Sequence, residues 1–93
     1  MLSTYTIYTM PNCPHCVSAK ELFKREGITF SERSADPKAE NPFTREELIA
    51  HVGPVRTLPQ IILKNGEGEF HIGGYTDLLA YRKGEKLDLR KIA

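Results

Sequence analysis

The chain has 93 residues, of which 40% are hydrophobic and 27% are charged, and its formal net charge is +1. This length suffices for one modest hydrophobic core, so we expect a single domain over residues 1–93. The balanced charge gives no electrostatic reason to expect nucleic acid or an acidic membrane as a partner. The longest apolar runs are only a few residues, which excludes a membrane-spanning helix of about 20 residues, and the first residues lack the pattern of a signal peptide.

Strand and helix patterns alternate in the first half of the chain. β-branched and aromatic residues predict strands at 5–9 and 28–33. From Pro14 to about Glu26, apolar residues recur every three to four positions, which predicts a helix that ends at Gly27.

The second half of the chain predicts two more helices around a pair of strands. A helix over about 44–51 begins with the Thr-x-x-Glu pattern of a capping box. Strands at 60–64 and 69–72 are joined by a hairpin loop that we expect to be longer than two residues. A third helix, capped by Thr76 or a neighbour, follows, and the predicted order is β-α-β-α-β-β-α with no firm element over 85–93.

The two cysteines, Cys13 and Cys16, form a CxxC motif between the first strand and the first helix. A pair closing so short a gap removes little chain entropy, and a zinc site needs four ligands, so we expect neither a stabilising disulfide nor a metal site. A thiol at a helix N-terminus is stabilised as the thiolate by free N–H groups and the helix dipole. We therefore predict that Cys13 is the nucleophile of thiol–disulfide exchange and that Cys16 resolves the mixed disulfide.

The two residues between the cysteines are candidates for tuning the thiol. Pro14 stiffens the loop. His15 either places positive charge near Cys13, which favours the reduced form, or is simply a solvent-exposed side chain. A second histidine, His71, is expected to be a surface residue of its strand.

Two later segments have the composition of ligand-binding turns. Leu58-Pro59 stands at a strand start, where a cis bond would present the Leu58 backbone to an extended substrate; the alternative is an ordinary trans proline. Gly73-Gly74 precedes a helix start, where N–H groups hold a carboxylate while Asp77 holds an ammonium. The alternative for that segment is a tight glycine turn with Asp77 as a helix-terminal charge.

Three segments resemble, in order, the signatures of a small dithiol glutaredoxin: Tyr8-Thr-x-x-x-Cys13-Pro-His-Cys16, Thr57-Leu-Pro-Gln60 and His71-Ile-Gly-Gly-x-x-Asp77. The resemblance covers residues 5–81. It implies a thioredoxin-like α/β fold, with a four-stranded mixed sheet flanked by three helices. It also implies glutathione as co-substrate, no tightly bound cofactor, and disulfide-containing or glutathionylated proteins as substrates; ribonucleotide reductase is a common client of the family.

The resemblance also assigns roles by position. Cys13 is similar to the family's nucleophile and Cys16 to its resolving thiol. The Leu58 backbone and a cis Pro59 would pair with the cysteinyl unit of glutathione. The whole glutathione-binding set that the resemblance implies is Arg56 for the glycine carboxylate, Leu58 and Pro59 for the cysteinyl unit, Gly74, Thr76 and Asp77 for the γ-glutamyl end, and Thr57 beside them.

Two residues depart from the family pattern. His15 stands where many members have tyrosine, and Met10 stands where many have a lysine that contacts the glycine carboxylate. The missing lysine keeps open an alternative function, a glutaredoxin-like redoxin reduced by thioredoxin reductase. A further alternative is an iron–sulfur-binding glutaredoxin, which Pro14 disfavours. We expect a monomeric, cytoplasmic enzyme, because reducing-type thiol motifs belong to that compartment.

Overall fold

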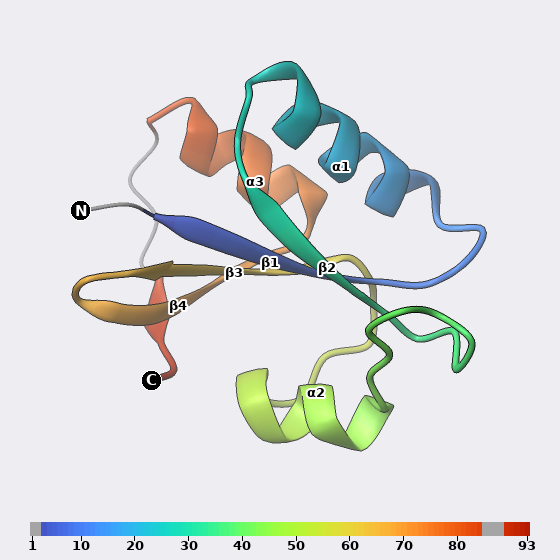
Figure 1. Cartoon of the computed structure of the whole chain (residues 1–93). Helices are drawn as coiled ribbons and strands as arrows, with labels where there is room; N and C mark the ends of the chain where they lie inside the picture. The colour runs from blue at the N-terminus through green and yellow to red at the C-terminus, as the bar shows by residue number, and fades with distance from the viewer. Residues whose placement is uncertain (1–2, 85–88) are drawn as a thin grey trace.

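The computed structural model describes residues 3–84 and 89–93. One mixed sheet lies between two layers of helices (Figure 1). Helices α1 (Pro14–Arg25) and α3 (Tyr75–Arg82) lie on one face, and α2 (Arg45–Val52) lies on the other. The strands are β1 (Thr4–Thr9), β2 (Phe30–Ser34), β3 (Gln60–Asn65), β4 (Gly68–Gly73) and β5 (Arg90–Lys91).

The sheet confirms the predicted mixed architecture but has one strand more than expected. Its order is β2-β1-β3-β4-β5, with β1 and β2 parallel and the other neighbours antiparallel. The added strand β5 pairs Arg90 with His71 and Lys91 with Phe70. Two exposed charged residues carry no apolar alternation, so no local pattern marks this strand. Of the segment 85–93, residues 85–88 lie outside the described part of the chain.

The β3–β4 hairpin is tighter than predicted. Asn65 pairs with Gly68, which leaves only Gly66 and Glu67 in the turn. The Asn65 side chain accepts a hydrogen bond from Glu67 N–H at 2.8 Å and closes the turn. Gly68 belongs to the strand through its pairing with Asn65, and the residue there is glycine because φ is +133° and a side chain would meet the carbonyl oxygen of Ala93.

Each helix begins as its local sequence dictates, with one correction. Cys13 is the N-cap of α1 and Pro14 occupies its first turn. In α2, Thr44 accepts a hydrogen bond from Glu47 N–H at 3.1 Å, and Glu47 reaches back to Thr44 N–H at 3.4 Å, so the predicted capping box is confirmed. Helix α3 is capped by Gly74 rather than Thr76, which lies within its first turn.

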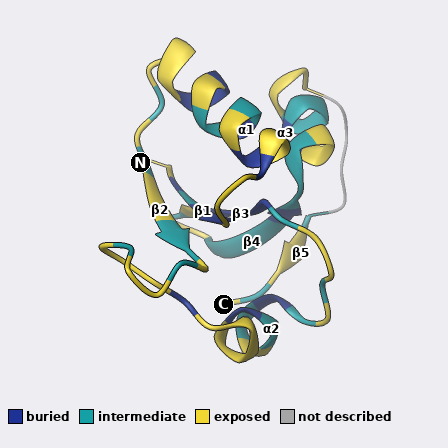
Figure 2. Cartoon of the chain, turned by 90° about the vertical axis from the view of Figure 1, so that its right-hand side faces the viewer, coloured by how far each residue is buried: buried dark blue, intermediate teal, exposed yellow. Residues whose placement is uncertain are grey.

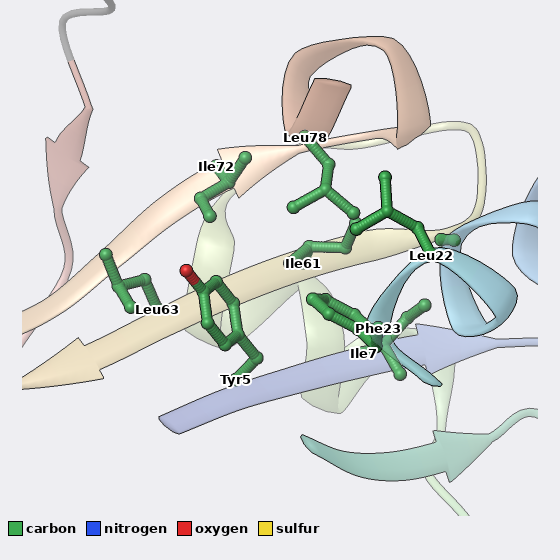
Figure 3. Close-up of a cluster of buried hydrophobic side chains, with 9 residues drawn as sticks. Tyr5, Ile7, Leu22, Phe23, Ile61, Leu63, Ile72 and Leu78 are labelled. Carbon is green, nitrogen blue, oxygen red and sulfur yellow. The ribbon is translucent and has the colours of Figure 1, made fainter. Parts of the chain in front are cut away.

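Buried side chains form two clusters, one on each face of the sheet. Figure 2 marks the buried positions along the strands and helices. Alternate residues of β1 and β3 point to opposite faces, so Ile61 joins one cluster and Ile62 the other. The larger cluster lies under α1 and α3 and is centred on Phe23, which is 0% exposed (Figure 3). The smaller cluster packs Tyr8 edge-on against Phe43 beneath α2. The two clusters fix the sheet, and with it the loops at the edge where the cysteines lie.

Candidate functional site

The two cysteines form a disulfide at the N-terminus of α1. The bond joins Cys13 and Cys16 with an S–S distance of 2.16 Å. Cys13 is 5% exposed and Cys16 is 2% exposed, so Cys13 is the more accessible sulfur by a small margin. Cys16 N–H donates to Cys13 Sγ at 3.2 Å. The same N–H group stabilises negative charge on that sulfur once the bond is reduced.

The loop before β3 lies against the nucleophile candidate. The Leu58–Pro59 peptide bond is cis, which confirms that expectation. Leu58 O lies 3.6 Å from Cys13 Sγ. A backbone segment therefore runs past the sulfur at a distance where a bound peptide-like substrate would meet both.

A hollow of about 440 Å³ opens beside this contact. It brings together residues from three separate segments of the sequence: the start of α1, the loop before β3 and the β4–α3 turn. Most of the predicted binding residues line it. The lining residues that had been predicted are His15, Thr57, Leu58, Pro59, Gly74, Thr76 and Asp77, with Pro14 exposed on the adjoining first turn of α1.

His15 forms one wall of the hollow from an exposed position. Its ring centroid lies 6.0 Å from that of Tyr75, the first residue of α3. This placement corresponds to the solvent-exposed alternative and adds a contact across the mouth of the hollow. Its effect on the Cys13 thiol remains a prediction.

The opposite wall is the N-terminus of α3. Asp77 Oδ2 accepts a hydrogen bond from Gly74 N–H at 2.9 Å, so this carboxylate caps the helix. First-turn N–H groups of a helix have no intrahelical partner and attract anions. The wall therefore offers a helix end that attracts a negative group and a carboxylate that attracts a positive one. A zwitterionic ligand carries both of these charges.

Gly73 is required by this turn, and Gly73→Ala is expected to destabilise it. Its φ is +116°, and an added Cβ would lie 2.5 Å from Asp77 Oδ2. The substitution therefore adds a clash with the capping carboxylate to a backbone strain of about 1–2 kcal/mol. Urea unfolding should show a larger loss than for Gly27→Ala, where φ is +67° and nothing lies within 4 Å of the added Cβ. Equal losses would contradict the clash.

Arg56 is not brought into this hollow. It lines a second hollow of about 370 Å³ together with Met10, Phe43 and Arg45. The two hollows share Val55, Thr57 and Leu58 as a common wall. Arg56 thus lies on the other side of the Leu58 loop from Asp77.

Among the lining residues that the sequence patterns did not assign to the site are His71 and Gln60. His71 is half-buried in the hollow rather than on the strand surface, and burial and the guanidinium of Arg90 lower its pKa below 6.5. His71 pairs with Ile62, whose neighbour on the same face is Gln60, so the two polar side chains meet diagonally. The register was the missing signal, because a β-bulge at Ile61/Ile62 sets it and no local pattern reveals it.

Two other features, a bilayer-spanning helix and a metal-binding cluster, do not occur in the described part of the chain. No helix in residues 3–84 or 89–93 has the length and apolar character needed to span a bilayer. Across the same described residues, His, Cys, Asp and Glu side chains do not gather in threes at metal-binding distance.

The chain is similar to proteins of one family over most of its length. The family model described as Glutaredoxin matches residues 5–68. A glutaredoxin of Pseudomonas aeruginosa is 43% identical over 82 residues, which are 88% of this chain and 88% of that protein.

Solved structures agree with the sequence comparison. Glutaredoxin 1 from Francisella tularensis, complexed with cacodylate, superposes with a TM-score of 0.67 at 31% identity and covers 89% of this chain and 95% of its own. A buckwheat glutaredoxin–glutathione complex gives a TM-score of 0.66 at 21% identity, covering 89% of this chain and 72% of its own, which shows a common fold. The predicted thioredoxin-like fold is confirmed, with five strands in place of four.

Proposed function

The chain belongs to the glutaredoxin family, and on that basis we propose that it is a glutathione-dependent enzyme that reduces protein disulfides and glutathione mixed disulfides. Family membership and the Cys13–Cys16 disulfide identify it as a thiol–disulfide oxidoreductase. Dependence on glutathione is the added proposal. The observation that carries it is the hollow next to the contact between Cys13 and Leu58. Its walls include the Leu58 backbone and the N-terminus of α3 at Gly74.

The proposed reaction with a protein disulfide has two exchanges. The Cys13 thiolate attacks one substrate sulfur, so a Cys13–substrate disulfide forms and the other substrate sulfur leaves as a thiolate. Cys16 then attacks Cys13 Sγ, releases the second substrate thiolate, and passes its own proton to the solvent or the leaving group. The enzyme ends as the observed Cys13–Cys16 disulfide, and two electrons have passed to the substrate.

Glutathione closes the cycle. One glutathione thiolate attacks the Cys13–Cys16 disulfide and forms a Cys13–glutathione disulfide; a second attacks that bond and releases oxidised glutathione and the dithiol. With a glutathionylated protein as substrate, the Cys13 thiolate takes the glutathione directly. Only the second glutathione step is then needed, and Cys16 takes no part.

The walls of the hollow suit a tripeptide lying across the Leu58 loop. The α-carboxylate and ammonium of the γ-glutamyl end fit the α3 N-terminus and Asp77, with Thr76 alongside. The cysteinyl unit fits the backbone at Leu58, next to Cys13. Arg56 lies on the far side of that loop, so it would receive the glycine carboxylate at the other end of the extended tripeptide.

We place this activity in the cytoplasm of the cell, in one domain acting as a monomer on disulfide-containing and glutathionylated proteins. Glutathione is a co-substrate in this scheme rather than a bound cofactor. The reducing conditions of that compartment return the cysteines to the dithiol between turnovers.

The test is the reduction of a glutathione mixed disulfide with glutathione, glutathione reductase and NADPH. We expect wild type to turn over, with NADPH consumption proportional to enzyme concentration. Asp77→Ala should raise the KM for the mixed disulfide about tenfold, because it removes the partner of the γ-glutamyl ammonium. Lys38→Ala is the matched control, because Lys38 lines neither hollow.

Wild type without activity in this assay would overturn the glutathione dependence. Activity with thioredoxin reductase and NADPH in its place would then assign the redoxin alternative. Met10, which stands where many family members have a lysine, is the departure from the family pattern to which such a result would point.

A further inference from the structure

A connected row of hydrogen bonds joins three residues that line the hollow, His71, Gln60 and Thr57. His71 Nε2 lies 2.7 Å from Gln60 Oε1, and Gln60 Nε2 donates to Thr57 O at 2.9 Å. Gln60 is only 5% exposed, so its amide depends on protein partners at both ends. The row therefore runs from β4 through β3 to the carbonyl just ahead of the Leu58–Pro59 bond.

The row has a single direction. The Gln60 amide nitrogen Nε2 donates a hydrogen bond to Thr57 O. The Gln60 atom that faces His71 is therefore the amide oxygen Oε1, which accepts from His71 Nε2–H. His71 Nδ1 is then without a proton, and it accepts from Arg90 Nη2 at 3.4 Å. Arg90 also donates to Val52 O at the end of α2. A neutral His71 with its proton on Nε2 satisfies every bond in the row.

We propose that His71 is a positioning residue for the exchange reaction: through Gln60 it holds the Thr57 carbonyl, and so keeps the Leu58 backbone at the distance from Cys13 that a bound substrate requires. The proposal rests on the proposed function. Leu58 O lies 3.6 Å from Cys13 Sγ, while the side chain of Thr57 is exposed and its carbonyl is tied to Gln60. Loss of His71 leaves the buried Gln60 oxygen without a hydrogen-bond partner. The loop before β3 is then no longer connected to β4 through Gln60.

The groups around His71 give the row a pH dependence. Arg90 of β5 faces it and, after burial itself, is the main cause that lowers the pKa of His71 below 6.5. His51 of α2 acts in the same direction, and Asp77 of α3 opposes them. A proton on Nδ1 would point an N–H at the Arg90 guanidinium, so acidification breaks the row at this end. The protonated ring still donates Nε2–H to Gln60, so this break leaves in place the bond that holds the Thr57 carbonyl.

The test compares two substitutions at His71. His71→Leu should raise the KM for a glutathione mixed disulfide about tenfold, with kcat within about twofold of wild type, because a bond that orients the binding loop is lost. His71→Gln places an amide nitrogen near the position of imidazole Nε2 and should restore KM to within about threefold.

His51→Leu is the matched control. His51 is also a half-buried histidine, bonded to Glu69 at 3.2 Å, but it lines neither hollow beside Cys13. Measured under the same conditions, its KM should equal that of wild type. A lowered melting temperature in His71→Leu with an unchanged KM would show a merely structural role and overturn the proposal.

A second readout separates this proposal from the proposed function. In wild type, ¹⁵N NMR of the imidazole should show the proton on Nε2, and the Gln60 side-chain amide should exchange slowly with solvent. A proton on Nδ1 overturns the proposal whatever the enzyme's activity. Wild type that is inactive with glutathione overturns the proposed function instead. The ¹⁵N NMR spectrum then still tests whether His71 holds the row of hydrogen bonds.

Discussion

Cys13→Ser is expected to lower the rate of disulfide reduction by about a thousandfold or more, because a serine hydroxyl does not ionise near neutral pH and forms no mixed disulfide. Cys13 is the N-cap of α1, and its sulfur receives the Cys16 N–H and lies beside Leu58 O. Serine is also a good N-cap, so the helix should remain intact. The loss would therefore report on chemistry rather than on folding.

Cys16→Ser should separate the two reactions. Reduction of a glutathione mixed disulfide should continue at a rate of the same order as wild type, since Cys13 alone forms and releases the glutathione adduct. Reduction of a protein disulfide such as that of insulin should fall by about a hundredfold, because the Cys13–substrate bond has no internal thiol to resolve it. Both variants lack the Cys13–Cys16 disulfide, so each controls for the other's loss of that bond. Full mixed-disulfide activity in Cys13→Ser would reverse the assignment of nucleophile.

Phe23→Ala is expected to reduce the free energy of unfolding by about 3–5 kcal/mol, the usual cost of truncating a buried aromatic side chain. Phe23 is 0% exposed and lies between α1 and the sheet. Its ring centroid is 5.1 Å from that of Tyr5 and 5.0 Å from that of Phe30. Since domains are typically stable by about 5–15 kcal/mol, this loss is a large fraction of the total stability.

Urea unfolding followed by circular dichroism gives the value for Phe23→Ala. Phe30→Ala is the matched control, because Phe30 stacks on the same ring but is only half-buried on β2. It should cost less than half as much, since less of its area leaves water on folding. Equal losses would mean that the core is not centred on Phe23.

The elements predicted well from the sequence are those with local causes. Thr44 and Glu47 mark the start of α2 because both halves of the capping box lie within one turn. Pro14 and Gly27 bracket α1 for similarly local reasons, since the structure ends the helix at Arg25, just before that glycine. Such features depend on backbone groups only a few residues away.

The elements that were missed have distant partners. Strand β5 is a strand because Arg90 and Lys91 pair with β4, about 20 residues earlier in the chain. Gly68, which ends the short hairpin turn, must be glycine because it accommodates Ala93, which is equally remote. Neither pairing leaves a trace in the local sequence.

The candidate site shows the same division between residues with local causes and residues with distant partners. Cys13, Cys16 and the turn that ends in Asp77 were identified from motifs with fixed spacing. In the structure, Asp77 lines the hollow and Cys13 Sγ lies 3.6 Å from the carbonyl oxygen of Leu58, which lines it too. His71 was assigned to the surface because a lone histidine in a strand gives no sign of what lies across from it. Its partner Gln60 belongs to another strand and meets it only through the register of the sheet.

The short strand β5 has a consequence for how copies of this protein meet in concentrated solution. An uncovered outer strand is a template on which another chain can add, and this is the usual start of sheet aggregation. Strand β5 covers β4, presents two positive charges, Arg90 and Lys91, and offers only two residues of backbone. At the other margin, β2 carries Glu32 and Arg33, both already held in ion pairs. Growth of the sheet from either margin would have to desolvate these charges, so the architecture itself opposes assembly into fibres.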